Sequence, residues 1–370
     1  MLHKNRLFTP GPTPLLPAAQ TAMASFTAHH RTADFKALFQ RVLADMKEFI
    51  GTNNDVLVLT AGKFGERWTG LGKAFNCNVD VLSAPYGETF SPEEVRSRLT
   101  PDVRAVFVQA TESSTGARHD VEGIARIVRA QGDDTLLVVD AITGLGTTHL
   151  DVDGWGVDVI IGGSQKALMM PPGLAYCAVS ERAWKRMDAT TSPRYYFDLR
   201  KERKSAAKGE TAYTPATSLF AALGAALDFV RGMGKGHLAK GREELVNNAE
   251  LCAEMTRTGA KALGLELYAS APAAALTAIS APDGLDSGQI VKEFRESFDA
   301  VVANGQGEMK GKLFRIAHIG YYDYLDTVGI LGALEHVLAR VTDRSVEFGA
   351  AVRAAQQVYA RSQELVTAAR

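Results

Sequence analysis

Short apolar runs alternate with segments of helical periodicity over much of the first half of the chain, and this alternation restricts the fold more than any other feature. Each run is rich in Val, Ile and Leu, as expected of strands that are buried on both faces. Repetition of strand, helix and strand predicts a mainly parallel β-sheet with helices on both sides, which is the α/β class. The expected strands lie at 55–60, 79–84, 104–110, 135–141, 157–163 and 174–180.

The chain is expected to divide into three parts. Four prolines and a glycine in the segment TPGPTPLLP exclude a helix, so residues 1–17 form an extended N-terminal arm. Residues 18–235 contain the predicted sheet and form a large domain. Long helical patterns dominate from about Thr217, and residues 236–370 form a smaller α+β domain. The charge-rich stretch 200–210 lacks core residues and is predicted to be a surface loop.

The composition excludes several classes of partner. The chain has 41 Lys+Arg and 42 Asp+Glu residues, a balance that gives no electrostatic basis for binding nucleic acid or an acidic membrane. Its three cysteines lack the spacing of a metal site, so no metal is expected, and their sparse, odd count is typical of a reducing compartment. No run is long enough to span a bilayer or to form a signal peptide. We therefore expect a soluble, cytoplasmic protein.

One lysine, Lys166, has an unusual sequence context. It lies in the segment GGSQKALMMPPG, directly after the predicted strand 157–163. The carboxyl ends of parallel strands form the crevice in which open α/β sheets bind ligands. Desolvation in such a crevice lowers the pKa of a lysine and frees its amine to attack a carbonyl carbon. Taken alone, an exposed loop lysine is the alternative.

Further polar and aromatic features have two interpretations each. Asp140 ends the run LLVVD, and it is either a site carboxylate or a helix cap. The hydroxyl-rich segment 110–118 is either part of a site or a capping turn. Arg315 interrupts the apolar run KLFRIAHIG, and it either forms an ion pair within the fold or binds a ligand carboxylate. Phe64 lies in a glycine-flanked turn, where an aromatic side chain usually packs in a core.

A lysine and an aspartate at neighbouring strand ends are the pair that pyridoxal phosphate requires. The aspartate keeps the pyridine nitrogen protonated, which makes the ring an electron sink, and the lysine holds the aldehyde. Only 26 residues separate Asp140 from Lys166, which leaves room for one crossover and one strand. The two side chains can therefore follow neighbouring strands of one sheet.

Seven segments of the chain occur in an order that is typical of a known family. In these segments the chain resembles the class V aminotransferases, which belong to the fold-type I superfamily of pyridoxal-phosphate enzymes. It is most similar to the alanine/serine–glyoxylate (or pyruvate) aminotransferases, and to relatives sometimes labelled as a soluble hydrogenase small subunit. The resemblance spans nearly the whole chain, through LFTPGPTPLLP, AGKFGERW, TESSTG, VVDAITGLG, GGSQKALMMPPG, TAYTPATSL and FRIAHIG.

The resemblance implies a role for each matching residue. Lys166 would form the Schiff base with the coenzyme and later carry the proton between the substrate Cα and the coenzyme C4′. Asp140 would pair with the pyridine nitrogen, and Arg315 would hold the substrate carboxylate. A homodimer is implied, because one segment reaches the partner subunit. The other implied contacts are Phe64 with the ring, Ser113 with the phenolic oxygen, Gln165 with the phosphate, Thr214 and Tyr213 with the partner's phosphate, and Gly11 with Pro10 at the substrate entrance.

The sequence departs from the family pattern at one place. In the family, the strand that matches 55–60 leads into a Ser/Gly-rich turn and a helix, whose N-terminal N–H groups cradle the coenzyme phosphate, and then into a second strand. Here Thr60 runs directly into Ala61, so this crossover is missing. Its loss would expose apolar faces of the neighbouring elements. Either Gln165 and Thr214 alone bind the phosphate, and coenzyme binding is weak or absent, or the sequence is shorter than that of the working protein.

Three hypotheses of function result. The first is a homodimeric aminotransferase that moves an amino group from a small amino acid, alanine or serine, to glyoxylate or pyruvate. The second is a non-catalytic homologue that keeps the aminotransferase fold and has impaired coenzyme binding. The third, a cysteine desulfurase or a lyase, is disfavoured because a desulfurase needs a nucleophilic cysteine on a loop, whereas Cys177 and Cys252 fall within strand and helix patterns.

Overall fold

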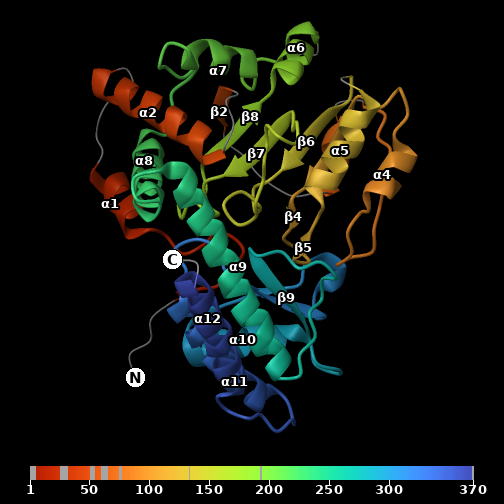
Figure 1. The fold of residues 1–370 in the computed structure, drawn as a ribbon, viewed down its shortest axis with the longest axis vertical. Helices are drawn as coiled ribbons and strands as arrows, with labels where there is room; N and C mark the ends of the chain where they lie inside the picture. The colour runs from red at the N-terminus through yellow and green to blue at the C-terminus, as the bar shows by residue number, and fades with distance from the viewer. Residues whose placement is uncertain are drawn as a thin grey trace.

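A mainly parallel sheet forms the centre of the larger part of the molecule (Figure 1). The computed structural model describes residues 6–25, 32–50, 55–59, 66–74, 77–132, 134–191 and 194–368. The strand order is β2-β8-β7-β6-β3, in which β3, β6 and β7 run parallel and β8 runs antiparallel between β7 and β2. The predicted α/β sheet is confirmed. Its strands are β2 (Asp55–Leu59), β3 (Ala105–Gln109), β6 (Leu136–Asp140), β7 (Val159–Gly163) and β8 (Ala175–Val179).

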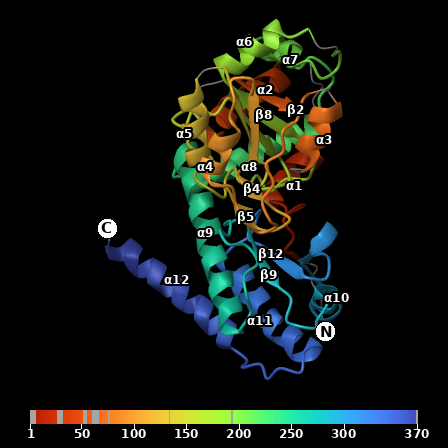
Figure 2. The same ribbon diagram turned by 90° about the vertical axis from the view of Figure 1, so that its right-hand side faces the viewer.

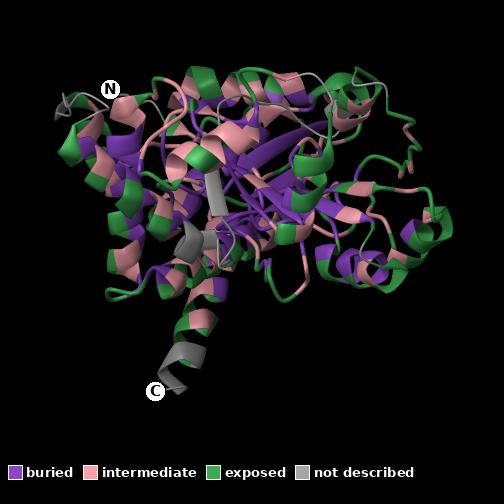
Figure 3. Cartoon of the chain, turned by 90° about the horizontal axis from the view of Figure 1, so that it is seen from above, coloured by how far each residue is buried: buried purple, intermediate pink, exposed green. Residues whose placement is uncertain are grey.

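Apolar side chains cover both faces of this sheet, and its strands β6, β7 and β8 are largely buried (Figure 3). Leu137 and Ile160 point into the larger layer, and Val138 and Val159 point into the smaller one, as the two-residue repeat of a strand requires. Helices α1 (Pro17–Ser25), α2 (Ala33–Ile50), α5 (Val121–Gln131) and α8 (Thr217–Met233) pack on the larger layer. Helices α6 (Glu181–Ala189) and α7 (Leu199–Ala206) pack on the smaller layer.

The C-terminal part has its own hydrophobic core around a small antiparallel sheet, ordered β11-β12-β9. Helix α9 (Leu238–Ala262) joins the two cores, because Leu245 packs in the first and Met255 in the second. Figure 2 shows α9 running along both parts of the molecule. The other elements are β9 (Leu276–Ser280), β11 (Ala303–Asn304), β12 (Leu313–Ala317), η1 (Gly307–Met309), α10 (Ser287–Phe298), α11 (Tyr324–Val341) and α12 (Ala350–Ala368).

Short elements join the two parts and complete the N-terminal half. Strand β1 (Arg6–Leu7) of the arm pairs in parallel with β10 (Ala300–Val301), so the arm crosses to the C-terminal part. The remaining elements are α3 (Glu66–Ala74), α4 (Pro92–Arg98), β4 (Thr111–Glu112) and β5 (Ala117–Arg118). No helix within the described residues is both long and apolar enough to cross a bilayer.

Two sequence predictions are wrong. Residues 79–84 form no strand, and β3 is the outermost strand in the described part of the sheet, since this segment makes no ladder with it. A strand requires a hydrogen-bonding partner, and the apolar pattern alone does not supply one. Residues 200–206 of the predicted loop lie instead within helix α7, and Asp198 caps the N-terminus of this helix. Charged residues fit this helix because none of its residues is fully buried, and the guanidinium of Arg203 lies over the ring of Trp184 at 4.5 Å.

Candidate active site

The loop that carries Lys166 is held in one conformation by its own hydrogen bonds. Ser164 is fully buried; its hydroxyl donates to the Pro171 carbonyl at 2.7 Å and accepts from the Leu174 N–H. Met169 is buried and has a φ of 58°, in the left-handed region that side chains other than glycine rarely adopt. Such strain persists only where the surroundings determine the backbone, and it gathers at functional sites. The loop is therefore a stiff support for the lysine.

The amine of Lys166 is buried under the N-terminal arm. Only 4% of the residue is exposed, and Nζ donates to the Pro10 carbonyl at 2.7 Å. A Cβ atom at Gly11 would lie 3.0 Å from Nζ, so the arm needs glycine at this close approach. The Thr13 hydroxyl lies within hydrogen-bond distance of the Gln165 and Lys166 carbonyls, at 3.2 and 3.3 Å. Burial lowers the pKa of Lys166 to about 8, a loss that the nearby charge of Asp140 partly offsets.

Asp140 lies at the same sheet edge as Lys166. It ends β6, which pairs in parallel with β7, and Lys166 follows β7 by three residues. Its carboxylate accepts the Ile142 N–H at 3.1 Å and the indole N–H of Trp68 at 3.3 Å. Burial raises the pKa of Asp140, while the positive charge of Lys166 opposes that rise. The structure thus brings the two predicted residues together, each buried and each electrostatically coupled to the other.

Arg315 comes to this site from the C-terminal part. It lies in the middle of β12, is 4% exposed, and donates to the carbonyls of Ser113 and Asn304, both at 2.6 Å. Burial lowers the pKa of Arg315 to about 10, so the side chain keeps its charge at neutral pH. In the described part of the chain its buried Nε has no hydrogen-bond partner. Backbone carbonyls therefore orient the guanidinium and leave it one unused donor.

Two residues at the site were missed by sequence reasoning. Glu112 lies in β4, and its negative charge acts on Asp140, Lys166 and Arg315. Trp68 lies in α3 and reaches Asp140 across 72 positions of sequence. Both belong to segments that carry the family resemblance, TESSTG and AGKFGERW, and this membership is the only sequence signal for them.

The other predicted residues are distributed unevenly. Ser113 is buried beside Arg315, and Gln165 is half-buried beside Lys166. The rings of Tyr213 and Tyr196 contact each other, with centroids 4.4 Å apart and planes tilted by 30°, and Thr214 is exposed. Among the described contacts, Tyr213 joins the segment before α7 and not the group around Lys166. Phe64 lies outside the described residues.

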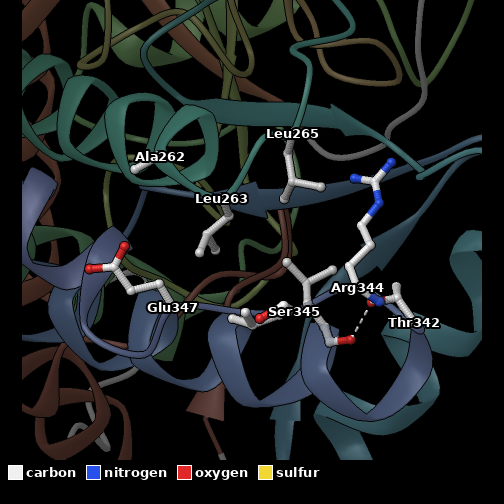
Figure 4. A pocket seen from close by; sticks show the side chains of 9 residues that line it. Ala262, Leu263, Leu265, Thr342, Arg344, Ser345 and Glu347 are labelled. Carbon is white, nitrogen blue, oxygen red and sulfur yellow. Dashed lines mark hydrogen bonds between the residues drawn. The ribbon is translucent and has the colours of Figure 1, made fainter.

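A pocket in the C-terminal part of the molecule is lined by residues outside the group around Lys166. It has a volume of about 260 Å³ and lies between the end of α9 and the loop that follows α11 (Figure 4). Its lining includes Leu263, Leu265 and Arg344 but none of the residues predicted from the sequence.

The chemistry of the site residues fits pyridoxal phosphate. Lys166 offers a desolvated amine, which a Schiff-base lysine needs. Asp140 already accepts an N–H from a flat aromatic heterocycle, the indole of Trp68, and a pyridinium N–H is a donor of the same kind. Lys166 and Asp140 would hold the coenzyme aldehyde and the ring nitrogen.

Comparison with known proteins identifies the family. The model of the class V aminotransferases matches residues 39–252. The chain is 35% identical to the soluble hydrogenase small subunit of Synechococcus, covering 97% of this chain and 99% of the relative, and 28% identical to the serine–glyoxylate aminotransferase of Methylorubrum extorquens, covering 99% and 98%. The structure of an alanine–glyoxylate aminotransferase from Nostoc superposes with a TM-score of 0.83 at 26% identity, covering 91% and 96%.

The alignment with the Synechococcus relative is longer than this chain. It spans 390 positions, which is more than the 370 residues of the chain, so the relative has residues that this chain lacks. The fold, the match over more than half of the chain and the nearly complete coverage of the relatives agree. The chain therefore belongs to the class V aminotransferases, fold-type I enzymes that use pyridoxal phosphate for transamination.

Proposed function

We propose that this chain moves the amino group of a small amino acid, alanine or serine, to glyoxylate or pyruvate. The observation that carries the proposal is the pair of buried, coupled groups Lys166 and Asp140 at one edge of the sheet. The choice of substrates is supported by the activities for which two similar proteins are named, a serine–glyoxylate and an alanine–glyoxylate aminotransferase.

The residues of the site divide the chemical work. When bound, pyridoxal phosphate supplies a carbonyl carbon and a ring that withdraws electrons. A pKa of about 8 leaves part of the Lys166 population neutral near pH 7, so its amine can accept and return the proton of the substrate Cα. The negative charge of Asp140 would keep the proton on the ring nitrogen. The arm over Lys166 excludes water from the amine.

Arg315 is proposed to bind the substrate carboxylate. Its guanidinium is held by two carbonyls, and its buried Nε has no partner in the described residues, so the side chain keeps a charge and an unsatisfied donor for a carboxylate. The negative charge of Glu112 beside Arg315 disfavours a second carboxylate on the substrate. This charge arrangement supports small, uncharged amino acids. Arg31, a candidate for binding a second carboxylate, lies outside the described residues.

The working form is proposed to be a cytoplasmic homodimer. Tyr195, Tyr196 and Phe197 expose 77%, 53% and 62% of their surfaces, and together they form an aromatic patch that a second copy can cover. Tyr213 belongs to the same patch, next to Thr214, which the family resemblance directs to the partner's phosphate. The three cysteines form no disulfide with one another in the described part of the chain, and a reducing compartment is proposed on their sparse, odd count.

A non-catalytic homologue is the second candidate. The segment missing after Thr60 favours it, because the family resemblance implies that this segment cradles the phosphate. In that case the pair Lys166 and Asp140 is kept while the coenzyme binds weakly or not at all.

An absorption spectrum with added pyridoxal phosphate tests the proposal. We expect the band of lysine-bound coenzyme in the wild type, its loss in Lys166→Ala, and amino transfer reduced about a thousandfold or more. Lys185→Ala, which removes an exposed lysine of α6, is the matched control and should keep the band. Absence of the band at saturating coenzyme, or a band that survives Lys166→Ala, would overturn the proposal. Amino transfer that is lost in Asp140→Ala would exclude the non-catalytic alternative.

A further inference from the structure

Trp68 donates a hydrogen bond to Asp140, the carboxylate proposed to pair with the coenzyme ring. Asp140 is 6% exposed, and a buried carboxylate oxygen without a donor is costly. The Ile142 N–H satisfies Oδ1, and the indole Nε1 of Trp68, at 3.3 Å, is the donor to Oδ2. Both carboxylate oxygens of Asp140 are thus paired within the chain.

The indole ring also lies on an open part of the sheet. It stacks on Phe107 of β3 with ring centroids 5.2 Å apart and an interplanar angle of 26°. Phe107 is opposite Val138 in the register of β3 and β6, so Phe107, Val138 and Asp140 share one face. Phe107 remains 53% exposed and Trp68 is half-buried. In the described part of the chain, a stacking contact with Phe107 and a hydrogen bond to Asp140 hold the half-buried indole ring.

We propose that Trp68 closes the coenzyme site of the free chain, by giving Asp140 an internal substitute for the pyridinium N–H. This inference rests on the proposed function, since it concerns access of the coenzyme to the same site. A pyridinium N–H that approaches Oδ2 would compete with the indole N–H for this oxygen, so coenzyme binding is expected to weaken or displace the Trp68–Asp140 hydrogen bond. Trp68 is in this sense a gating residue and takes no part in the proton transfer.

The variant Trp68→Phe tests the proposal, because it keeps an aromatic ring for Phe107 and removes the N–H. We expect the dissociation constant for pyridoxal phosphate, measured by absorbance titration, to fall by about tenfold, as expected from the loss of one competing hydrogen bond to a charged group. Trp155→Phe, at an indole that contacts His149 instead, is the matched control and should leave the constant unchanged.

A second measurement does not depend on that variant being stable. The chain has three tryptophans, so its ¹H–¹⁵N spectrum has three indole signals. With pyridoxine phosphate, which has the ring and phosphate but no aldehyde, we expect the Trp68 indole signal to shift and its N–H to exchange faster with water. The signals of Trp155 and Trp184 should stay in place.

The outcomes separate this inference from the proposed function. If lysine-bound coenzyme forms but Trp68→Phe binds it no more tightly and the indole signal does not move, the gating role is wrong and the aminotransferase proposal stands. If no coenzyme binds to the wild type or to Trp68→Phe, both proposals fail together. Tighter binding in Trp68→Phe with a shifted indole signal in the wild type establishes the gate.

Discussion

Two regions of the same sheet edge differ sharply in how completely they are built. At the ends of β6 and β7, Asp140 and Lys166 are buried, and each has defined hydrogen-bond partners. In the chain segment that links β2 to β3, the predicted strand 79–84 does not form, and Phe107 on β3 is 53% exposed. We propose that the first region holds the ring of the coenzyme, whereas the second contains the position at which the family resemblance implies a crossover for the phosphate.

This difference shows that the two halves of such a site have separate structural origins. Inner strands position Asp140 and Lys166, since β6 and β7 are neighbours with partners on both sides. A crossover at the margin of the sheet can be lost while that pair keeps its geometry. We therefore propose that the ring site is retained without the phosphate cradle, and that restoring the cradle improves binding without changing the ring site.

The largest expected effect comes from restoring the crossover. We would insert between Thr60 and Ala61 a Ser/Gly-rich turn, helix and strand of the kind that the family resemblance implies. The dissociation constant for pyridoxal phosphate should fall by about a hundredfold, because a phosphate cradle adds several charge-assisted hydrogen bonds. Absorbance titration measures the change. A Gly/Ser insert of equal length is the control, and equal affinity in the graft and the control would show that the two regions do not divide the work in this way.

A stability measurement probes the region that is well built. Arg315→Met leaves the carbonyls of Ser113 and Asn304 buried without their donor, at a cost of about 1–3 kcal/mol each. We expect the free energy of unfolding in urea to fall by about 3 kcal/mol. The control, Arg126→Met, removes an exposed arginine from a pair with Glu122 and should cost less than about 0.5 kcal/mol. A loss as small as that of the control would mean that Arg315 is not part of the core.

The same contrast explains what the sequence predicts well and what it does not. Periodicity is sufficient for β6, β7 and the long helices, because each is determined by its own buried face. The pairing of Asp140 with Lys166 could be predicted because both end strands only 26 residues apart. The contact of Arg315 with Ser113 joins positions 202 apart, and local patterns contain no information on such distances. The prediction for 79–84 is wrong for a related reason, since a strand depends on a neighbour that its own residues do not encode.

The protonation of Lys166 offers a smaller effect with a defined sign. Its pKa in the folded chain is about 8, below the value of about 10.4 in an unfolded chain. Between these values the unfolded state binds more protons, so the free energy of unfolding rises with pH. Compared with Lys166→Met, the wild type should gain about 2 kcal/mol between pH 8 and pH 10.

Chemical labelling checks the same group directly. The rate of acetylation of Lys166 should reach half its maximum near pH 8, and Asp140→Asn should move that midpoint to lower pH, because the charge of Asp140 raises the pKa of Lys166. A midpoint that stays in place in Asp140→Asn would contradict the coupling of the two groups.

The smallest effect is expected at Phe107, and it tests the incomplete region from the other side. Because the side chain is 53% exposed, Phe107→Ser should cost about 1 kcal/mol or less, most of it from the stacking contact with Trp68. In the grafted chain the restored elements would cover this face, and the same substitution should cost about 2–3 kcal/mol. Val108→Ala is the internal control, since Val108 is buried on the opposite face and should cost the same in both chains. An equal cost of Phe107→Ser in the two chains would mean that the crossover does not pack on β3, and the exposure of Phe107 would then have a cause other than its loss.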